Sequence, residues 1–152
     1  MSELFFGKFQ PPTKAHVNII QQLLDPIVVV VYTNITIKKP FSKEIIEKMF
    51  FEYGIYPKFI NTGYLPDILE QLSIQPEYLV CGSDRYKHYD KIIKELSLEI
   101  KLIEIDRNIS DISSTKVRYA LLTENEYLYR ILMPYKFWNY FSELCQIYKN
   151  LK

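Results

Sequence analysis

A ten-residue segment near the amino terminus constrains the fold of this chain more than any other part of it. Residues 7–16 read Gly-Lys-Phe-Gln-Pro-Pro-Thr-Lys-Ala-His and join the apolar run of residues 4–6 to the amphipathic pattern of residues 17–24. A strand is therefore predicted to turn directly into a helix. At such a junction the unpaired backbone N–H groups and the positive end of the helix dipole favour an anion such as a phosphate.

Side chains suited to phosphate binding stand within the same segment. Thr13 and His16 are spaced so that they share one face in the first turn of the predicted helix. Lys8 and Lys14 add positive charge around the same point. The segment predicts a phosphate site at the end of the first strand, and a proline turn with an incidental histidine is the alternative interpretation.

A second anion site is predicted later in the chain, where residues 112–118 read Ile-Ser-Ser-Thr-Lys-Val-Arg. Asp111 or Ser113 before the apolar pattern marks the start of a helix. Ser114 and Arg118 lie on one face of that helix. Hydroxyls, free backbone amides and a fixed guanidinium together suit a polyphosphate tail. An ordinary capped helix would also fit this segment, but two anion sites in one chain favour a shared role.

Strand and helix patterns alternate along the whole chain. The β-branched run 27–32 is typical of a buried parallel strand, and the partly alternating run 100–105 suits a strand nearer the edge of a sheet. Further elements are expected as helices at 43–53 and 66–72 and as strands at 59–60 and 78–81.

This alternation predicts the fold class. We expect an α/β, Rossmann-like, doubly wound parallel sheet of five strands with helices on both faces and a helical tail at about 124–152. Residues 1–152 would form a single domain. Ligands of such sheets bind at the carboxyl ends of the strands, which is where the segment 7–16 begins.

A third candidate feature follows the strand predicted at 78–81. Gly82 and Asp84 could present a backbone amide and a carboxylate to the hydroxyls of a ribose. A plain turn with Ser83 or Asp84 as the helix N-cap is the alternative. Both interpretations can hold together.

A basic loop precedes the helix predicted at residue 43. Lys38 and Lys39 stand before Pro-Phe-Ser, in which Ser42 is a natural N-cap. The two lysines could contact a substrate phosphate or belong to a solvated loop. The sequence leaves these two interpretations open.

Composition excludes several classes of protein. Apolar residues make up 48% and charged residues 24% of the 152, which excludes a disordered chain, and the net charge of +1 disfavours general nucleic-acid binding. Cys81 and Cys145 stand in no metal-binding motif and are expected to be buried thiols. No segment reaches transmembrane length and the start lacks a signal peptide, so a cytoplasmic protein without membrane partners is expected. The sequence leaves homo-oligomerisation open.

The two anion motifs resemble those of the nucleotidylyltransferase superfamily. Gly7-Lys8-Phe9-Gln10-Pro11-Pro12 followed by Thr13-Lys14-Ala15-His16 is similar to its G-x-F-x-P and (H/T)-x-G-H signature, although Ala15 stands where glycine is usual, and residues 112–118 match I-S-S-T-x-x-R. The resemblance implies a catalytic group formed by Lys8, Thr13, His16 and Arg118. It implies ATP contacts at Gly7, Phe9, Gln10, Gly82, Asp84, Ser113, Ser114 and Thr115. For the acceptor phosphate it implies Lys38, Lys39 and Arg85.

Within that superfamily the motifs look most like those of nicotinamide- or nicotinate-mononucleotide adenylyltransferases. The resemblance implies transfer of AMP from ATP to the phosphate of a mononucleotide, with pyrophosphate leaving and Mg²⁺ carried by the triphosphate. Phosphopantetheine adenylyltransferases and the cytidylyltransferases of alcohol phosphates remain alternatives. A nucleotide-binding regulatory module without turnover is the alternative from another class.

Overall fold

A computed structural model describes residues 2–105 and 114–151 of the chain. Five parallel strands form one sheet in the order β3-β2-β1-β4-β5. The strands are β1 (Glu3–Gly7), β2 (Pro26–Val31), β3 (Lys58–Ile60), β4 (Tyr78–Gly82) and β5 (Lys101–Ile105). The prediction that residues 100–105 form a strand near an edge is confirmed, because β5 is an outer strand of this sheet.

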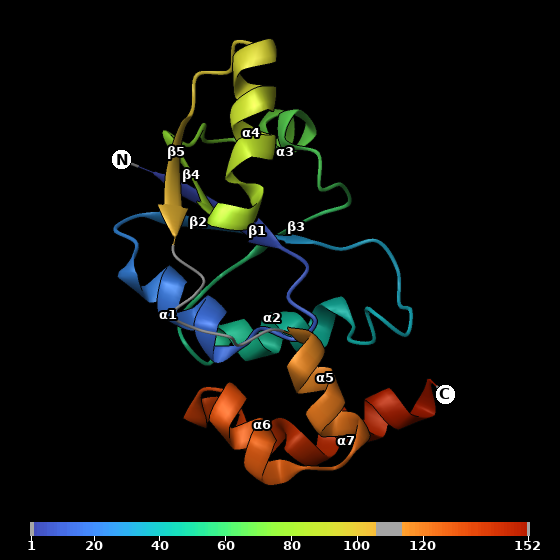
Figure 1. Ribbon diagram of the computed structural model, residues 1–152. Helices are drawn as coiled ribbons and strands as arrows, with labels where there is room; N and C mark the ends of the chain where they lie inside the picture. Colours follow the sequence, from blue (N-terminus) through green and yellow to red (C-terminus); the bar gives the residue numbers. More distant parts are fainter. Residues whose placement is uncertain (1, 106–113, 152) are drawn as a thin grey trace.

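Helices cover both faces of the sheet (Figure 1). One face carries α1 (Lys14–Gln22) and α2 (Lys43–Phe51), and the other carries α3 (Leu65–Gln71) and α4 (Ser83–Glu95). The carboxyl-terminal part of the chain lies beyond α1 and α2 and consists of α5 (Ser114–Leu122), α6 (Glu126–Leu132), the 3₁₀ helix η2 (Tyr135–Tyr140) and α7 (Phe141–Asn150). The predicted α/β class and the helical carboxyl terminus are confirmed.

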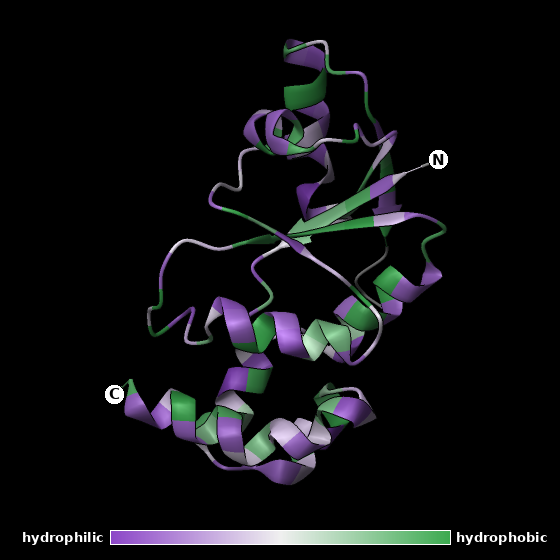
Figure 2. Ribbon diagram, turned by 180° about the vertical axis from the view of Figure 1, so that it is seen from behind, coloured by the Kyte–Doolittle hydropathy of each residue, from purple (hydrophilic) through white to green (hydrophobic). Residues whose placement is uncertain are grey.

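Alternation along the strands divides the core between the two faces. Leu4 and Val29 pack into the cluster that includes α3 and α4, whereas Phe5, Val28 and Val30 pack toward α1, α2 and the carboxyl-terminal helices. Figure 2 shows the central strands in the apolar colour, as expected of parallel strands that are covered on both sides. The rigid sheet formed in this way holds the carboxyl ends of its strands in fixed positions.

The structure corrects one predicted helix start and confirms another. Helix α4 has Gly82 as its N-cap, and neither Ser83 nor Asp84 takes that place, because β4 stays paired with β5 through Gly82 and the helix follows at once. Ser42 caps α2 as expected, since its side chain accepts a hydrogen bond from the backbone N–H of Ile45.

The predicted helical tail packs most of its apolar side chains into the core, and the 3₁₀ helix η2 interrupts its α-helical geometry. Trp138 is 37% exposed, and its Nε1 donates to the carbonyls of Arg130 and Met133. Cys81 and Cys145 are buried thiols that are not joined in a disulfide, as predicted. Among the described residues, the helices are all too short or too polar to cross a membrane.

Candidate functional site

The order of the strands creates a switch point at β1. The chain builds β2 and β3 on one side of β1 and then returns to place β4 and β5 on the other, which is the arrangement that leaves a ligand crevice at the carboxyl ends. Strand β1 pairs with β2 from Glu3 to Gly7, whereas its register with β4 covers Glu3 and Leu4. Two cavities lie at this end of the sheet and share Gly7 and Lys8.

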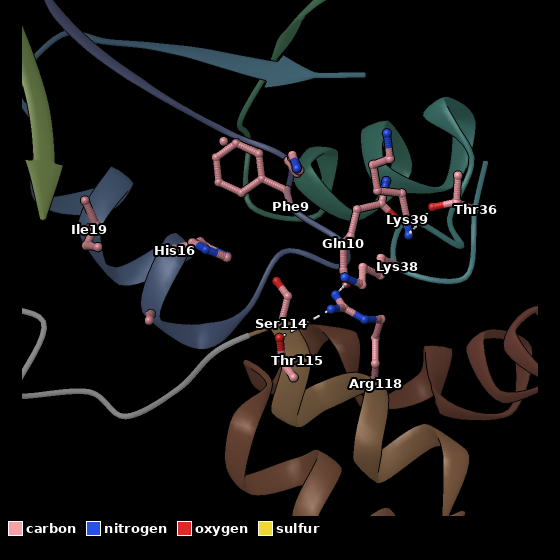
Figure 3. A pocket seen from close by; sticks show the side chains of 13 residues that line it. Phe9, Gln10, His16, Ile19, Thr36, Lys38, Lys39, Ser114, Thr115 and Arg118 are labelled. Carbon is pink, nitrogen blue, oxygen red and sulfur yellow. Dashed lines mark hydrogen bonds between the residues drawn. The ribbon is translucent and has the colours of Figure 1, made fainter. Parts of the chain in front are cut away.

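The first cavity, of about 520 Å³, brings together residues from four separate segments (Figure 3). They belong to the loop after β1, the start of α1, the loop 36–39 and the start of α5. The predicted site residues that line it are Gly7, Lys8, Phe9, Gln10, His16, Lys38, Lys39, Ser114, Thr115 and Arg118. The two motifs, which are about a hundred residues apart in the sequence, therefore line one cavity.

His16 is held at the start of α1 by the residue that precedes the helix. Its Nδ1 accepts a hydrogen bond of 3.0 Å from the backbone N–H of Thr13, and Thr13 Oγ1 lies 3.2 Å from the same nitrogen. Because a backbone N–H can only donate, Nδ1 carries no proton and the neutral ring keeps its proton on Nε2. The imidazole is thereby fixed as a hydrogen-bond donor on the side opposite Thr13.

Phe9 supports the imidazole from the other direction. Its ring meets the ring of His16 edge-to-face at 4.8 Å and the ring of Phe50 at 5.1 Å. Phe9 has a φ of 51°, which is an unfavourable backbone conformation for a residue other than glycine, and burial of its side chain holds it there. The turn after β1 is thus tight, and its aromatic side chain restrains the position of His16.

The start of α5 is bonded directly to the turn after β1. Arg118 Nη1 donates to the carbonyl of Gln10 at 2.7 Å, and Ser114 Oγ donates to the carbonyl of Pro11 at 2.9 Å. Arg118 Nη2 also reaches Thr115 Oγ1 at 3.3 Å. Burial lowers the pKa of the Arg118 guanidinium, which nevertheless keeps its charge at neutral pH. A fixed cation therefore stands in the wall of the first cavity.

The basic loop forms the opposite wall. The backbone groups of Thr36 and Lys39 bond to each other in both directions, at 3.0 and 3.1 Å. Lys39 Nζ donates to Thr33 Oγ1 at 2.8 Å, while Lys38 is exposed. Both lysines line the cavity, so the loop adds positive charge across from α5.

The second cavity, of about 370 Å³, lies between the carboxyl ends of β1 and β4 and the start of α4. Gly82, Asp84 and Arg85 line it, so these three predicted residues lie together but apart from the residues of α1 and α5. Arg85 lies over the ring of Tyr89, which also lines the cavity, and burial raises the pKa of the Tyr89 hydroxyl. This cavity combines an apolar floor with one carboxylate and one guanidinium at its rim.

Some predicted residues occupy other positions than the cavity walls. Thr13 is fully buried behind His16, so its contact with a phosphate stays a prediction while its bond to the imidazole is established. Ser113 lies outside the described residues. Lys14 is exposed. Ala15 lines the first cavity, so its methyl group takes the place of the usual glycine at the wall itself.

Thr36 and Tyr89 are among the lining residues that reasoning from the sequence missed. Thr36 lies in a loop with no periodic pattern, so no local signal could have placed it beside α5. Tyr89 follows Asp84 and Arg85 on α4 at a spacing that puts it near the same face, and this helical spacing was a usable signal.

The charges of the first cavity suit a polyanion. Its described lining contains lysines, an arginine, a histidine and hydroxyls, and no aspartate or glutamate. Across the described part of the chain there is no cluster of three or more histidine, cysteine or acidic side chains that could hold a metal. A parallel sheet with anion-binding groups at the carboxyl ends of its strands defines a nucleotide-binding α/β domain.

Comparison with known proteins gives the family. The family model described as cytidylyltransferase-like matches residues 4–120, and the chain belongs to this family of nucleotidyltransferases. The fold is similar to that of a Vibrio parahaemolyticus protein provisionally described as a nicotinate-nucleotide adenylyltransferase, with a TM-score of 0.65 and 18% identity over 95% of this chain and 97% of that one. Among curated proteins no significant match was found.

Proposed function

We propose that this nucleotidyltransferase moves AMP from ATP to the phosphate of nicotinamide or nicotinate mononucleotide. The observation that carries the proposal is the joining of the two phosphate motifs in one cationic cavity, which adjoins a second cavity suited to a nucleoside. The motif resemblance and the similar fold of the Vibrio parahaemolyticus protein support a pyridine mononucleotide as the acceptor.

The proposed reaction is a single in-line displacement. A phosphate oxygen of the acceptor attacks the α-phosphorus of ATP, a new P–O bond forms, and the bond to the β-phosphate oxygen breaks to release pyrophosphate. The enzyme has to position the groups and stabilise charge, and no covalent enzyme intermediate is required.

Each side chain of the first cavity has a proposed role in this step. His16 donates from Nε2 to an oxygen of the α-phosphate, where charge develops, and Thr13 keeps the ring in that orientation. Lys8, at the junction of the two cavities, bridges the phosphates. Ser114 and Arg118 hold the β- and γ-phosphates. Arg85 is a candidate for the acceptor, and Lys38 and Lys39, which line the same cavity as Arg118, are candidates both for the acceptor phosphate and for the outer phosphates of ATP.

Mg²⁺ is proposed to arrive bound to the triphosphate. The described wall of the first cavity has no carboxylate, which fits a cation held by phosphate oxygens and water better than one held by a protein cage. When bound, the ion would neutralise part of the charge of the triphosphate. The cationic side chains of the cavity would supply the rest.

A panel of acceptors with ATP and with CTP tests the proposal. Pyrophosphate release is followed with nicotinate mononucleotide, nicotinamide mononucleotide, phosphopantetheine, glycerol phosphate and choline phosphate. We expect release with ATP and a pyridine mononucleotide, and identification of the dinucleotide by mass spectrometry. Release with CTP and an alcohol phosphate alone would assign a cytidylyltransferase instead. ATP binding without release for every acceptor would favour a regulatory module.

A further inference from the structure

Gln10 is a buried polar side chain whose amide oxygen and amide nitrogen each form a hydrogen bond within the protein. The residue as a whole is only 3% exposed. Gln10 Oε1 accepts from the backbone N–H of Phe41 at 2.9 Å, and Gln10 Nε2 donates to the carbonyl of Phe41 at 3.2 Å. One amide thus satisfies both backbone polar groups of a buried residue, where an unpaired group would carry a full desolvation penalty.

The same residue holds the opposite wall of the first cavity through its backbone. The carbonyl of Gln10 accepts the 2.7 Å hydrogen bond from Arg118, and the next carbonyl, that of Pro11, accepts from Ser114. Figure 3 shows Gln10 between the loop that carries Lys38 and Lys39 and the helix that carries Arg118. Gln10 is therefore bonded to Arg118 in one cationic wall and to Phe41, two residues after Lys39 in the other.

The loop that carries the lysines has its own internal bonds. Two backbone hydrogen bonds close it between Thr36 and Lys39, and Lys39 Nζ fastens it to Thr33. Phe41, two residues after Lys39, is where the side chain of Gln10 bonds to the segment that follows this loop.

We propose that Gln10 is a positioning residue, which fixes the lysine loop relative to Arg118 so that both walls contact one polyphosphate ligand together. The inference rests on the proposed function, because it takes the triphosphate of ATP as that ligand. It assigns the amide of Gln10 to the protein, whereas the sequence motif predicted that Gln10 contacts ATP. The expected consequence is that the contribution of the loop lysines to binding depends on the Gln10 side chain.

A double-mutant cycle tests this dependence. Gln10→Met keeps the length of the side chain and removes its amide, and Lys38→Ala removes a loop cation that does not brace the loop as Lys39 does. ATP binding in the presence of Mg²⁺ is measured by calorimetry for the wild type, both single variants and the double variant. We expect each single substitution to weaken ATP binding about 10-fold. In the Gln10→Met protein, Lys38→Ala should weaken ATP binding by less than about 3-fold.

A remote variant controls for simple loss of stability. Asn125 caps α6 by accepting from the N–H of Leu128, so Asn125→Ala also removes a side-chain to backbone hydrogen bond but lies outside the lining of both cavities. We expect Asn125→Ala to leave the affinity for ATP unchanged. The loss of ATP affinity caused by Lys38→Ala should also be the same in the Asn125→Ala protein as in the wild type. If Gln10→Met does not fold, Gln10→Glu keeps an oxygen for the N–H of Phe41 and loses the donor, and the same cycle is run with it.

Amide hydrogen exchange provides a readout that needs no ligand. In the free protein, the amides of residues 36–41 should exchange faster in the Gln10 variant than in the wild type and should be unchanged by Asn125→Ala. Unchanged exchange rates for the amides of residues 36–41 would overturn the inference. So would a loss of ATP affinity on Lys38→Ala that is the same in the wild-type and Gln10→Met proteins, including no loss in either. A wild-type protein that does not bind ATP would instead count against the proposed function, and the exchange result would still decide whether Gln10 holds the loop.

Discussion

Replacement of Arg118 by alanine should weaken the binding of ATP far more than the binding of AMP. The guanidinium is bonded to the Gln10 carbonyl and to Thr115 Oγ1 in the wall of the first cavity, so it reaches the ligand already oriented. A hydrogen bond to a charged group contributes about 1.5–3 kcal/mol. Loss of one such contact to the β- or γ-phosphate should weaken ATP roughly 10- to 100-fold, at 1.4 kcal/mol for each factor of ten.

AMP lacks the two outer phosphates, so its affinity should fall by less than about 3-fold, the scale of a substitution that removes no direct contact. Arg118→Lys should recover only part of the ATP affinity, because an ammonium group cannot reproduce the planar fork that serves the carbonyl and the phosphate at once. The affinities are measured by isothermal titration calorimetry on the folded variants.

Arg130→Ala is the matched control. Arg130 lies on α6, where it pairs with Glu126 and stacks on Trp138, and its loss removes the same charge without touching either cavity. We expect wild-type affinity for both nucleotides in this variant. Equal losses for ATP and AMP in Arg118→Ala would refute the assignment of Arg118 to the outer phosphates, since they would indicate a general change in the cavity.

Three further predictions concern other groups. His16→Ala should lower kcat by roughly 10²- to 10³-fold with a much smaller loss of ATP affinity, measured by steady-state kinetics and calorimetry, and near-normal turnover would exclude His16 from the chemistry. Asp84→Ala should cost about 1.5–3 kcal/mol of ATP binding and much less for 2′-deoxy or 3′-deoxy ATP, and equal costs for all three would contradict a ribose contact. Burial and Glu52 raise the pKa of Tyr140 to about 12, so the stability from their 3.1 Å hydrogen bond should be complete below pH 10 and lost as the pH rises toward 12. Urea unfolding across that range should show a steeper loss for the wild type than for Tyr140→Phe, and parallel losses would contradict this assignment.

The sequence predicted the elements of the fold and most of the first cavity for a physical reason. Periodicity reports which side of a strand or helix is buried, and the β-branched run 27–32 and the motif 7–16 carried strong local signals of this kind. Chain order together with the right-handed crossover rule then placed the ends of the strands at one edge of the sheet.

The details that were missed depend on contacts between distant segments. The attachment of Gln10 to Phe41 joins two loops, and no local pattern indicates which backbone groups a glutamine amide will satisfy. Burial of Thr13 behind His16 likewise follows from packing of the whole α1 face and not from the motif. Gly82 replaced the expected N-cap residues of α4 because its pairing with β5 carried the strand up to the helix.

Labelled ATP tests most directly whether this nucleotidyltransferase transfers the adenylyl group of ATP to an acceptor phosphate, as we propose. ATP labelled on the α-phosphate and, in a parallel reaction, ATP labelled on the γ-phosphate are incubated with Mg²⁺ and nicotinate or nicotinamide mononucleotide, and the products are separated. We expect the α-label to enter the dinucleotide and the γ-label to leave in pyrophosphate. Transfer of the γ-label to the acceptor, or no acceptor-dependent movement of the α-label with either mononucleotide, would contradict the proposal.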